Sequence, residues 1–169
     1  GLNSIMKKVP IVIRSCEQAD LDFHAQFSAR SKTYRYHILN REDPAAVGRN
    51  YLWHIRKPLD IGSMKICCGH LEGEHDFKSF ENTGSPRSST VRTVFSADII
   101  RKKNERIIFE ISASGFLKYM VRNMMGTIVE AGLEKIDPDQ FRQILEGRDR
   151  TQAGPTAPPG GLFLYQVNY

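Results

Sequence analysis

The stretch that decides the fold covers residues 116–133 and reads FLKYMVRNMMGTIVEAGL. At the helical spacing of about 100° per residue, one continuous apolar stripe runs along it. The stripe consists of Leu117, Met120, Val121, Met124, Ile128 and Ala131. A second group of apolar and small residues falls on the other side: Tyr119, Met125, Gly126, Val129 and Leu133. A helix that is apolar on two sides is buried on both, so we predict that this helix lies at the centre of the domain.

Arg122 interrupts the second apolar side of the predicted helix. A buried charge without a partner is costly, so the guanidinium needs an anionic partner. The sequence leaves three partners open: a carboxylate within this chain, a phosphate, or a carboxylate on another domain or chain. Gly126 follows one helical turn later, and its missing side chain leaves room for another group to approach the helix.

The stretch 32–39 (KTYRYHIL) alternates strictly and predicts a strand. Tyr34 and Tyr36 lie on one face of this strand, and Arg35 lies on the other, more basic face. Four further strands are expected at 9–13, 91–101, 106–112 and 162–169, with a hairpin joining the second and third of these. Two further helices are expected at 60–71 and 137–147. Pro10 favours an edge position for the strand at 9–13.

This order of elements predicts an α+β fold with a mixed or mostly antiparallel sheet and helices packed on one face. The opposite face of the sheet would then be free. A free sheet face that carries basic and aromatic side chains is a common platform for RNA.

Composition narrows the class of protein without fixing its function. The chain has 169 residues, 40% of them hydrophobic, and a formal net charge of +5. That length favours one domain, and the positive charge favours an anionic partner. The three cysteines lack the spacing of a disulfide framework or a zinc site. No apolar run reaches the roughly 20 residues that span a membrane, so a cytoplasmic location is expected. No phosphate-binding glycine loop and no zinc-deaminase pattern occurs.

Several polar or exposed residues suit contacts with RNA. Tyr34 could stack on a base beside Lys32 and Arg35, although most strand tyrosines are core residues. Arg87 and Arg92 flank a Ser/Thr-rich stretch that suits phosphate contacts, but is equally compatible with a solvated loop. The loop at 154–164 (GPTAPPGGLFL) is stiffened by prolines and could hold Leu162 against a substrate base.

Five segments, in this order and spacing, resemble the tRNA pseudouridine synthase A family. They are DFHAQFSARSKTYRY (22–36), GEHDFKSF (73–80), SSTVRTV (88–94), GFLKYMVRNMMG (115–126) and AGPTAPPGGLFL (153–164). The resemblance is to the family's C-terminal domain and covers nearly all of residues 1–169. It implies a pseudouridine synthase domain of the RRM or ferredoxin-like kind. It also implies isomerisation of uridine to pseudouridine in the anticodon stem-loop of tRNA, without a metal or organic cofactor, by an enzyme that is a homodimer in bacteria.

The resemblance assigns roles to single residues. Arg122 corresponds to the arginine that pairs with the catalytic aspartate, Tyr34 to the active-site tyrosine that packs on the target base, and Leu162 to the apolar residue of the base pocket. We therefore predict that Arg122 and Tyr34 belong to the catalytic site. The predicted substrate-binding residues are Tyr34, Leu162, Lys32, Arg35, Arg87, Arg92 and Lys118.

The family's catalytic aspartate lies in an R-T-D-x-G-V-H-A motif of its N-terminal domain, and residues 1–169 contain no such motif. We therefore expect a fragment that contributes RNA binding and part of the cleft, that is inactive alone, and in which Arg122 lacks its family partner. One alternative is a non-catalytic RNA-binding module. Another is a protein-interaction domain that uses the second face of the 116–133 helix as a dimer surface.

Overall fold

The computed structural model describes residues 1–82, 84 and 88–169. Six strands and four α-helices are present in this part of the chain. The strands are β1 (Ser31–Asn40), β2 (Trp53–Ile55), β3 (Gly73–Asp76), β4 (Val91–Arg101), β5 (Arg106–Ala113) and β6 (Leu162–Asn168). The helices are α1 (Leu2–Ile5), α2 (Ile61–Leu71), α3 (Met120–Gly132) and α4 (Pro138–Gly147), with short 3-10 turns between elements.

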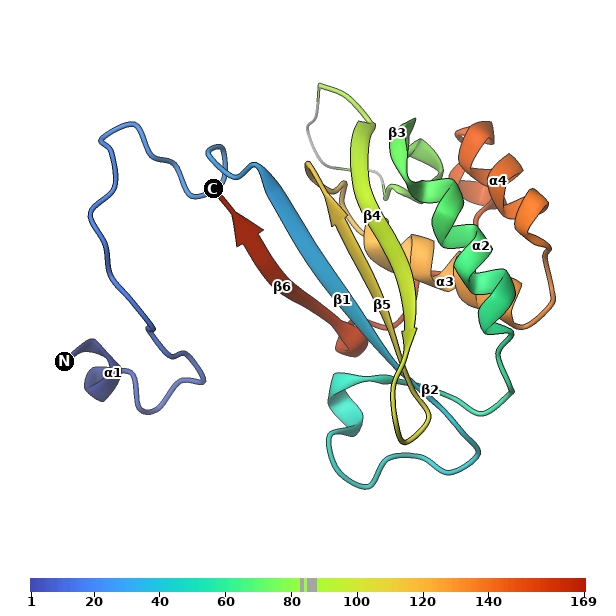
Figure 1. The fold of residues 1–169 in the computed structure, drawn as a ribbon, viewed down its shortest axis with the longest axis horizontal. Helices are drawn as coiled ribbons and strands as arrows, with labels where there is room; N and C mark the ends of the chain where they lie inside the picture. Colours follow the sequence, from blue (N-terminus) through green and yellow to red (C-terminus); the bar gives the residue numbers. More distant parts are fainter. Residues whose placement is uncertain (83, 85–87) are drawn as a thin grey trace.

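The strands form one mixed sheet in the order β2-β1-β5-β4-β3, and β6 also pairs with β1. Antiparallel β5 occupies one edge of β1 along nearly its whole length. The other edge is shared: β6 pairs with the first part of β1 in antiparallel fashion, and β2 pairs with its last three residues in parallel. Figure 1 shows the red β6 beside the blue β1. This arrangement confirms the predicted mixed, mostly antiparallel sheet.

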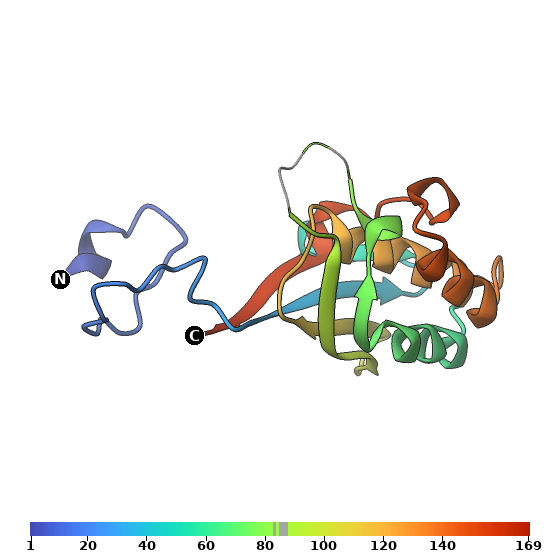
Figure 2. The ribbon, with the colours of Figure 1, turned by 90° about the horizontal axis from the view of Figure 1, so that it is seen from above.

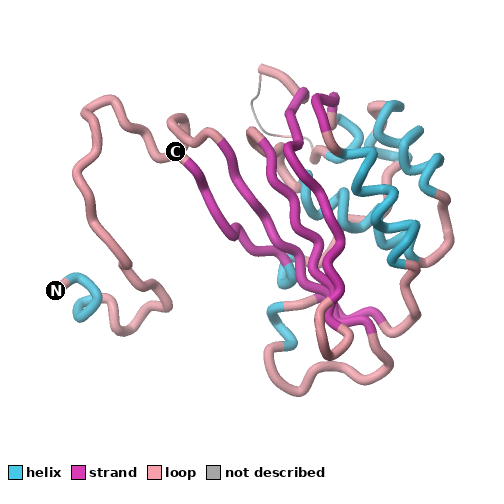
Figure 3. The backbone as a smooth tube through the Cα atoms, viewed as in Figure 1, coloured by secondary structure: helices cyan, strands magenta, loops and turns pink. Residues whose placement is uncertain are grey.

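The three longer helices lie together on one side of the sheet, as Figures 1 and 3 show. Alternation along the strands explains why: in β5, Ile107, Phe109, Ile111 and Ala113 are all nearly inaccessible to solvent and belong to the same core as the helices. Successive side chains of a strand point to opposite faces of the sheet, so every second side chain packs against the helices. The α+β prediction with helices on one face is therefore confirmed.

The central helix starts later than the sequence pattern predicts. α3 begins at Met120, because Tyr119 adopts a left-handed conformation with φ of 64° and interrupts the helical backbone. A non-glycine residue in this region is uncommon. Residues 116–119 therefore form a turn that leads into the helix. Eleven of the thirteen residues of α3 are buried, so the prediction of a helix buried on both sides is confirmed.

The predicted strand at 9–13 is wrong. Residues 1–29 form an exposed arm whose only helix is the four-residue α1, and the arm leads away from the body in Figure 2. No described strand pairs with residues 9–13, and the Ile11 amide bonds instead to the Val9 carbonyl. The sequence pattern also missed β2 and β3, whose three and four residues are too short to show alternation.

The described residues contain no helix that is both long and apolar enough to cross a membrane.

Candidate active site

Arg122 lies on the first turn of α3 and is half-buried. Its Nε donates a hydrogen bond of 2.7 Å to the Ala157 carbonyl. The Ala157 amide donates in return to the Arg122 carbonyl at 3.1 Å. The ring of Tyr119 lies 4.7 Å from the guanidinium carbon, a cation–π distance. The Ala157 carbonyl and the Tyr119 ring thus fix the guanidinium from two directions.

The loop at 153–157 covers the second apolar face of α3. A Cβ on Gly126 would lie 1.7 Å from the Pro155 carbonyl oxygen, so the glycine is what allows the loop backbone to rest on the helix. Met125 and Val129 are buried on this side. The group that approaches Gly126 therefore comes from this chain. The alternative in which this helix face is a free dimer surface is wrong for the same reason.

No described carboxylate forms an ion pair with Arg122, and no described residue bonds to its Nη atoms. This argues against a carboxylate partner within the described part of the chain. The start of α3 carries the positive end of the helix dipole, and Lys118 adds a second cation there. The Nη edge of Arg122, which has no partner among the described residues, therefore lies in a region that favours an anion.

Tyr34 is half-buried on the helical face of β1, next to the turn that leads into α3. Its ring meets the edge of the Phe116 ring at a centroid distance of 5.0 Å. Burial raises the pKa of the Tyr34 phenol, so the hydroxyl stays protonated at neutral pH. Strand alternation places Lys32 on this same face, two residues earlier.

Leu162 begins β6 and is held in place through its neighbour Tyr36. The two residues are paired across β1 and β6. The fully buried Tyr36 donates from its hydroxyl to the Pro158 carbonyl at 2.6 Å, and a Cβ on Gly161 would overlap the Tyr36 ring. Burial raises the pKa of Tyr36, and the nearby positive charge of Arg122 partly counteracts this. The end of the proline-rich loop is thus anchored to the central strand.

Two of the residues predicted to contact phosphate, Arg92 and Lys118, lie near the turn that leads into α3. Arg92 lies beside Gly115, where a Cβ would be 3.6 Å from its Nε, and it bonds to the Ser89 and Val91 carbonyls. Lys118 is exposed, and its Nζ lies 6.0 Å from the Tyr119 ring. Arg87 lies outside the described residues.

Arg35 is separated from this group by the sheet itself. It points to the face opposite Tyr34, where it pairs with Glu110 and stacks on the Tyr165 ring at 3.4 Å. Its pKa is raised chiefly by the hydrogen bond to Glu110. The sequence grouped Arg35 with Lys32 and Tyr34 as neighbours along the chain, but alternation separates them in space.

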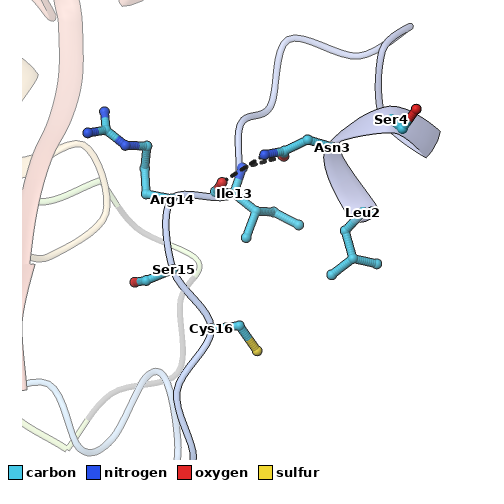
Figure 4. A pocket seen from close by; sticks show the side chains of 8 residues that line it. Leu2, Asn3, Ser4, Ile13, Arg14, Ser15 and Cys16 are labelled. Carbon is cyan, nitrogen blue, oxygen red and sulfur yellow. Dashed lines mark hydrogen bonds between the residues drawn. The ribbon is translucent and has the colours of Figure 1, made fainter.

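A hollow of about 360 Å³ lies elsewhere, within the N-terminal arm. Asn3, one of its lining residues, accepts a hydrogen bond from the Ile13 amide at 2.8 Å and donates one to the Ile13 carbonyl at 2.9 Å (Figure 4). None of its lining residues is a predicted site residue. The described residues contain no cluster of three or more side chains that could hold a metal ion.

Comparison with known proteins gives the family. A family model described as tRNA pseudouridine synthase matches residues 67–169. The tRNA pseudouridine synthase A of Thermoanaerobacter sp. (strain X514) is 46% identical over 170 residues, which cover the whole chain and 68% of that protein. The chain belongs to the tRNA pseudouridine synthase family. The tRNA pseudouridine synthase A 2 of Clostridium perfringens (strain 13 / Type A) is 42% identical, again over the whole chain and 68% of its own length.

Membership of the tRNA pseudouridine synthase family confirms the resemblance found in the five sequence segments, and it makes the chain part of an isomerase family. The similarity to the tRNA pseudouridine synthase A of Orientia tsutsugamushi (strain Ikeda) also extends over the whole chain, at 39% identity and 60% of that protein.

Sequence reasoning missed the polar residues that hold the loop onto α3. Asn123 and Thr127 are fully buried, and the Thr127 hydroxyl accepts a hydrogen bond from the Gly154 amide. Their spacing of four residues inside an otherwise apolar helix was the available signal. Buried polar side chains need partners, so this spacing pointed to a segment packed against the helix.

Proposed function

We propose that the protein containing these residues isomerises uridine to pseudouridine in the anticodon stem-loop of tRNA. The observation that carries the proposal is Arg122: its Nε is fixed by the Ala157 carbonyl while its outer edge has no described partner. A planar guanidinium suits bidentate binding of a carboxylate. Family membership and the 46% identity to a tRNA pseudouridine synthase A supply the reaction and the class of substrate.

The reaction exchanges one bond for another at the ribose. The N-glycosidic bond between C1′ and N1 breaks, the uracil rotates, and C1′ bonds to C5. C5 then loses its proton and N1 gains one, so that the product is an isomer of uridine. An aspartate serves as nucleophile or base in this sequence. We propose that a domain outside residues 1–169 supplies this aspartate and that Arg122 holds its carboxylate ionised and oriented. An ion pair with a guanidinium lowers the pKa of a carboxyl group.

Tyr34 provides a surface for the reacting base in this proposal. A base must leave the stack before its glycosidic bond can be attacked, which costs a few kcal/mol. Stacking on an aromatic ring returns about 1–3 kcal/mol. The edge contact with Phe116 limits how far the Tyr34 ring can turn, and Leu162 would line the same base pocket.

Lys32, Arg92 and Lys118 are proposed to contact phosphates around this pocket, and the same role is kept for Arg87. The helix dipole of α3 strengthens the attraction at its start. Homodimer formation is a further proposal that rests on the family resemblance, and a cytoplasmic location stays a prediction from the sequence.

The test is a pseudouridine assay with the full-length protein and a tRNA transcript. We expect pseudouridine to appear within the anticodon stem-loop, and replacing each uridine there by cytidine should identify the target. The 169-residue chain, assayed alone at the same concentration, should bind the transcript and form no pseudouridine. Turnover by the 169-residue chain would refute the assignment of the aspartate to another domain. Binding without turnover by the full-length protein would favour a non-catalytic RNA-binding module.

A further inference from the structure

Asn123 is a buried junction between three segments of the chain. Its side chain has no solvent exposure and uses all four of its usual hydrogen bonds. Nδ2 donates to the Phe80 carbonyl at 2.8 Å and to Asn82 Oδ1 at 3.3 Å. Oδ1 accepts from Thr156 Oγ1 at 2.6 Å and from Arg150 Nη2 at 3.1 Å. Asn123 directly follows Arg122 in α3.

Arg150 completes the junction from the other side of the loop. Its Nη1 donates to the Ala153 and Gly154 carbonyls, at 3.3 and 3.1 Å, and its Nη2 also donates to Thr156 Oγ1 at 3.1 Å. No described carboxylate forms an ion pair with Arg150. Burial lowers its pKa, but an arginine remains charged at neutral pH. The cation is therefore committed to holding the loop, and no acid among the described residues neutralises it.

The junction ends one residue from the group that fixes Arg122. Thr156, bound to Asn123 and Arg150, is followed by Ala157, whose carbonyl accepts from Arg122 Nε. A shift of Thr156 moves this carbonyl, and the guanidinium follows it. The junction also reaches the other end of the site, because the Asn82 amide donates to the Lys118 carbonyl.

We propose that Thr156, Asn123 and Arg150 are positioning residues for Arg122. They hold the Ala157 carbonyl where it turns the free edge of the guanidinium toward the catalytic carboxylate. The inference rests on the proposed function, since it assigns these residues to the orientation of the proposed arginine–aspartate pair. A misplacement of about 1 Å in a catalytic constellation can slow turnover by roughly a hundredfold.

The experiment removes one hydroxyl from the junction in the full-length protein. Thr156→Val keeps the volume and deletes the hydrogen bonds to Asn123 and Arg150, whereas Thr156→Ser retains the hydroxyl. The matched control is Thr151→Val, five residues earlier, whose hydroxyl donates a hydrogen bond to the exposed Asp149. We expect Thr156→Val to lower kcat by about ten- to a hundredfold with KM for tRNA changed less than about threefold. Thr156→Ser and Thr151→Val should keep kcat near that of the wild type.

A second readout follows the guanidinium directly by NMR of ¹⁵N-labelled arginine. The Nε–H of Arg122 should exchange slowly with water in the wild type and in Thr156→Ser, and quickly in Thr156→Val. If Thr156→Val does not fold, Arg150→Lys serves instead, because a lysine cannot reach all four acceptors of the guanidinium. Its expected changes have the same direction.

The inference is overturned if Thr156→Val, or Arg150→Lys where that variant is needed, keeps wild-type kcat and a protected Arg122 Nε–H. It is also overturned if the loss appears in KM alone, or if serine does not restore kcat. These outcomes differ from failure of the proposed function, in which the wild-type protein itself forms no pseudouridine. The exchange rate of the Nε–H then still decides whether the junction positions Arg122.

Discussion

Gly126→Ala is the sharpest perturbation of the contact between α3 and the loop at 153–157. The added methyl group would lie 1.7 Å from the Pro155 carbonyl oxygen and 2.9 Å from its carbonyl carbon. Both obstacles are backbone atoms, so no side-chain rotation relieves the overlap. The loop must retreat by roughly 1.5 Å or more before the contact becomes ordinary.

The loss of stability in Gly126→Ala follows from the contacts that break when the loop moves away from α3. Overpacking of this kind costs about 1–3 kcal/mol. The two hydrogen bonds between Arg122 and Ala157 are worth about 0.5–1.5 kcal/mol each. Alanine returns about 1 kcal/mol through its better helix propensity. We therefore expect a loss of about 3 kcal/mol in the free energy of unfolding, which lowers Tm by roughly 6–12 °C in a protein of this size.

Urea unfolding of the 169-residue chain, followed by the fluorescence of Trp53, its single tryptophan, measures this loss. Gly69→Ala in α2 is the matched control, because a Cβ there meets no atom within 4 Å. It should stabilise the chain by about 0.5–1 kcal/mol. The reasoning is refuted if Gly126→Ala leaves stability within about 0.5 kcal/mol of the wild type or raises it as Gly69→Ala does.

Three further predictions concern Tyr36, the cations and Tyr34. Tyr36→Phe should cost about 1–2 kcal/mol at pH 8 by leaving a carbonyl unsatisfied. Burial raises the pKa of Tyr36 in the folded state above the unfolded value of 10, so the stability that its hydroxyl contributes is present below pH 10 and is lost as the pH rises above it. The difference in the free energy of unfolding between the wild type and Tyr36→Phe, measured with urea, should therefore narrow by about 1.4 kcal/mol at pH 11. A difference that stays constant would contradict this. Lys118→Ala in the full-length protein should reduce, by about 0.7–0.9, the slope of the logarithm of the tRNA binding constant against the logarithm of the salt concentration. Arg35→Ala, on the opposite face of the sheet, should leave that slope unchanged. Equal slopes for both variants would argue against the placement of the phosphate contacts. Tyr34→Leu should lower kcat/KM by roughly 10- to 100-fold because stacking on the base is lost, while kcat/KM of Tyr34→Phe should stay within a few-fold of the wild type. If both variants lose kcat/KM equally, the hydroxyl and not the ring carries the function of Tyr34.

The sequence predicted those parts of the fold that carry a long periodic pattern. β1, β4, β5 and the body of α3 repeat their apolar residues often enough for period two or 3.6 to be recognised. Residues 9–13 (VPIVI) have the apolar, β-branched composition of a strand but no described strand to pair with, so local preference alone was misleading. Tyr119 shows a related limit, since its left-handed backbone depends on what surrounds the turn.

Arg122 was identified from the sequence as a charge on an apolar helix face, which implied a partner but not its identity. The contacts that orient Arg122 could not be predicted, because the Ala157 carbonyl reaches Arg122 only through tertiary packing. The same holds for the bonds by which Asn123 and Arg150 hold the loop. Every residue has a backbone carbonyl, so the sequence around Ala157 does not indicate that its carbonyl accepts a hydrogen bond from a distant guanidinium.

The central claim is that Arg122 orients a catalytic carboxylate and does not bind RNA phosphate. Single-turnover rates and tRNA dissociation constants of the full-length protein, compared for the wild type, Arg122→Lys and Arg122→Ala, test it most directly. We predict that both variants lose at least about a hundredfold in rate while the Kd for tRNA changes less than about threefold. Lysine should not rescue the rate, because it lacks the planar fork. A weaker Kd with a normal rate at saturating enzyme would contradict the account and make Arg122 a phosphate contact.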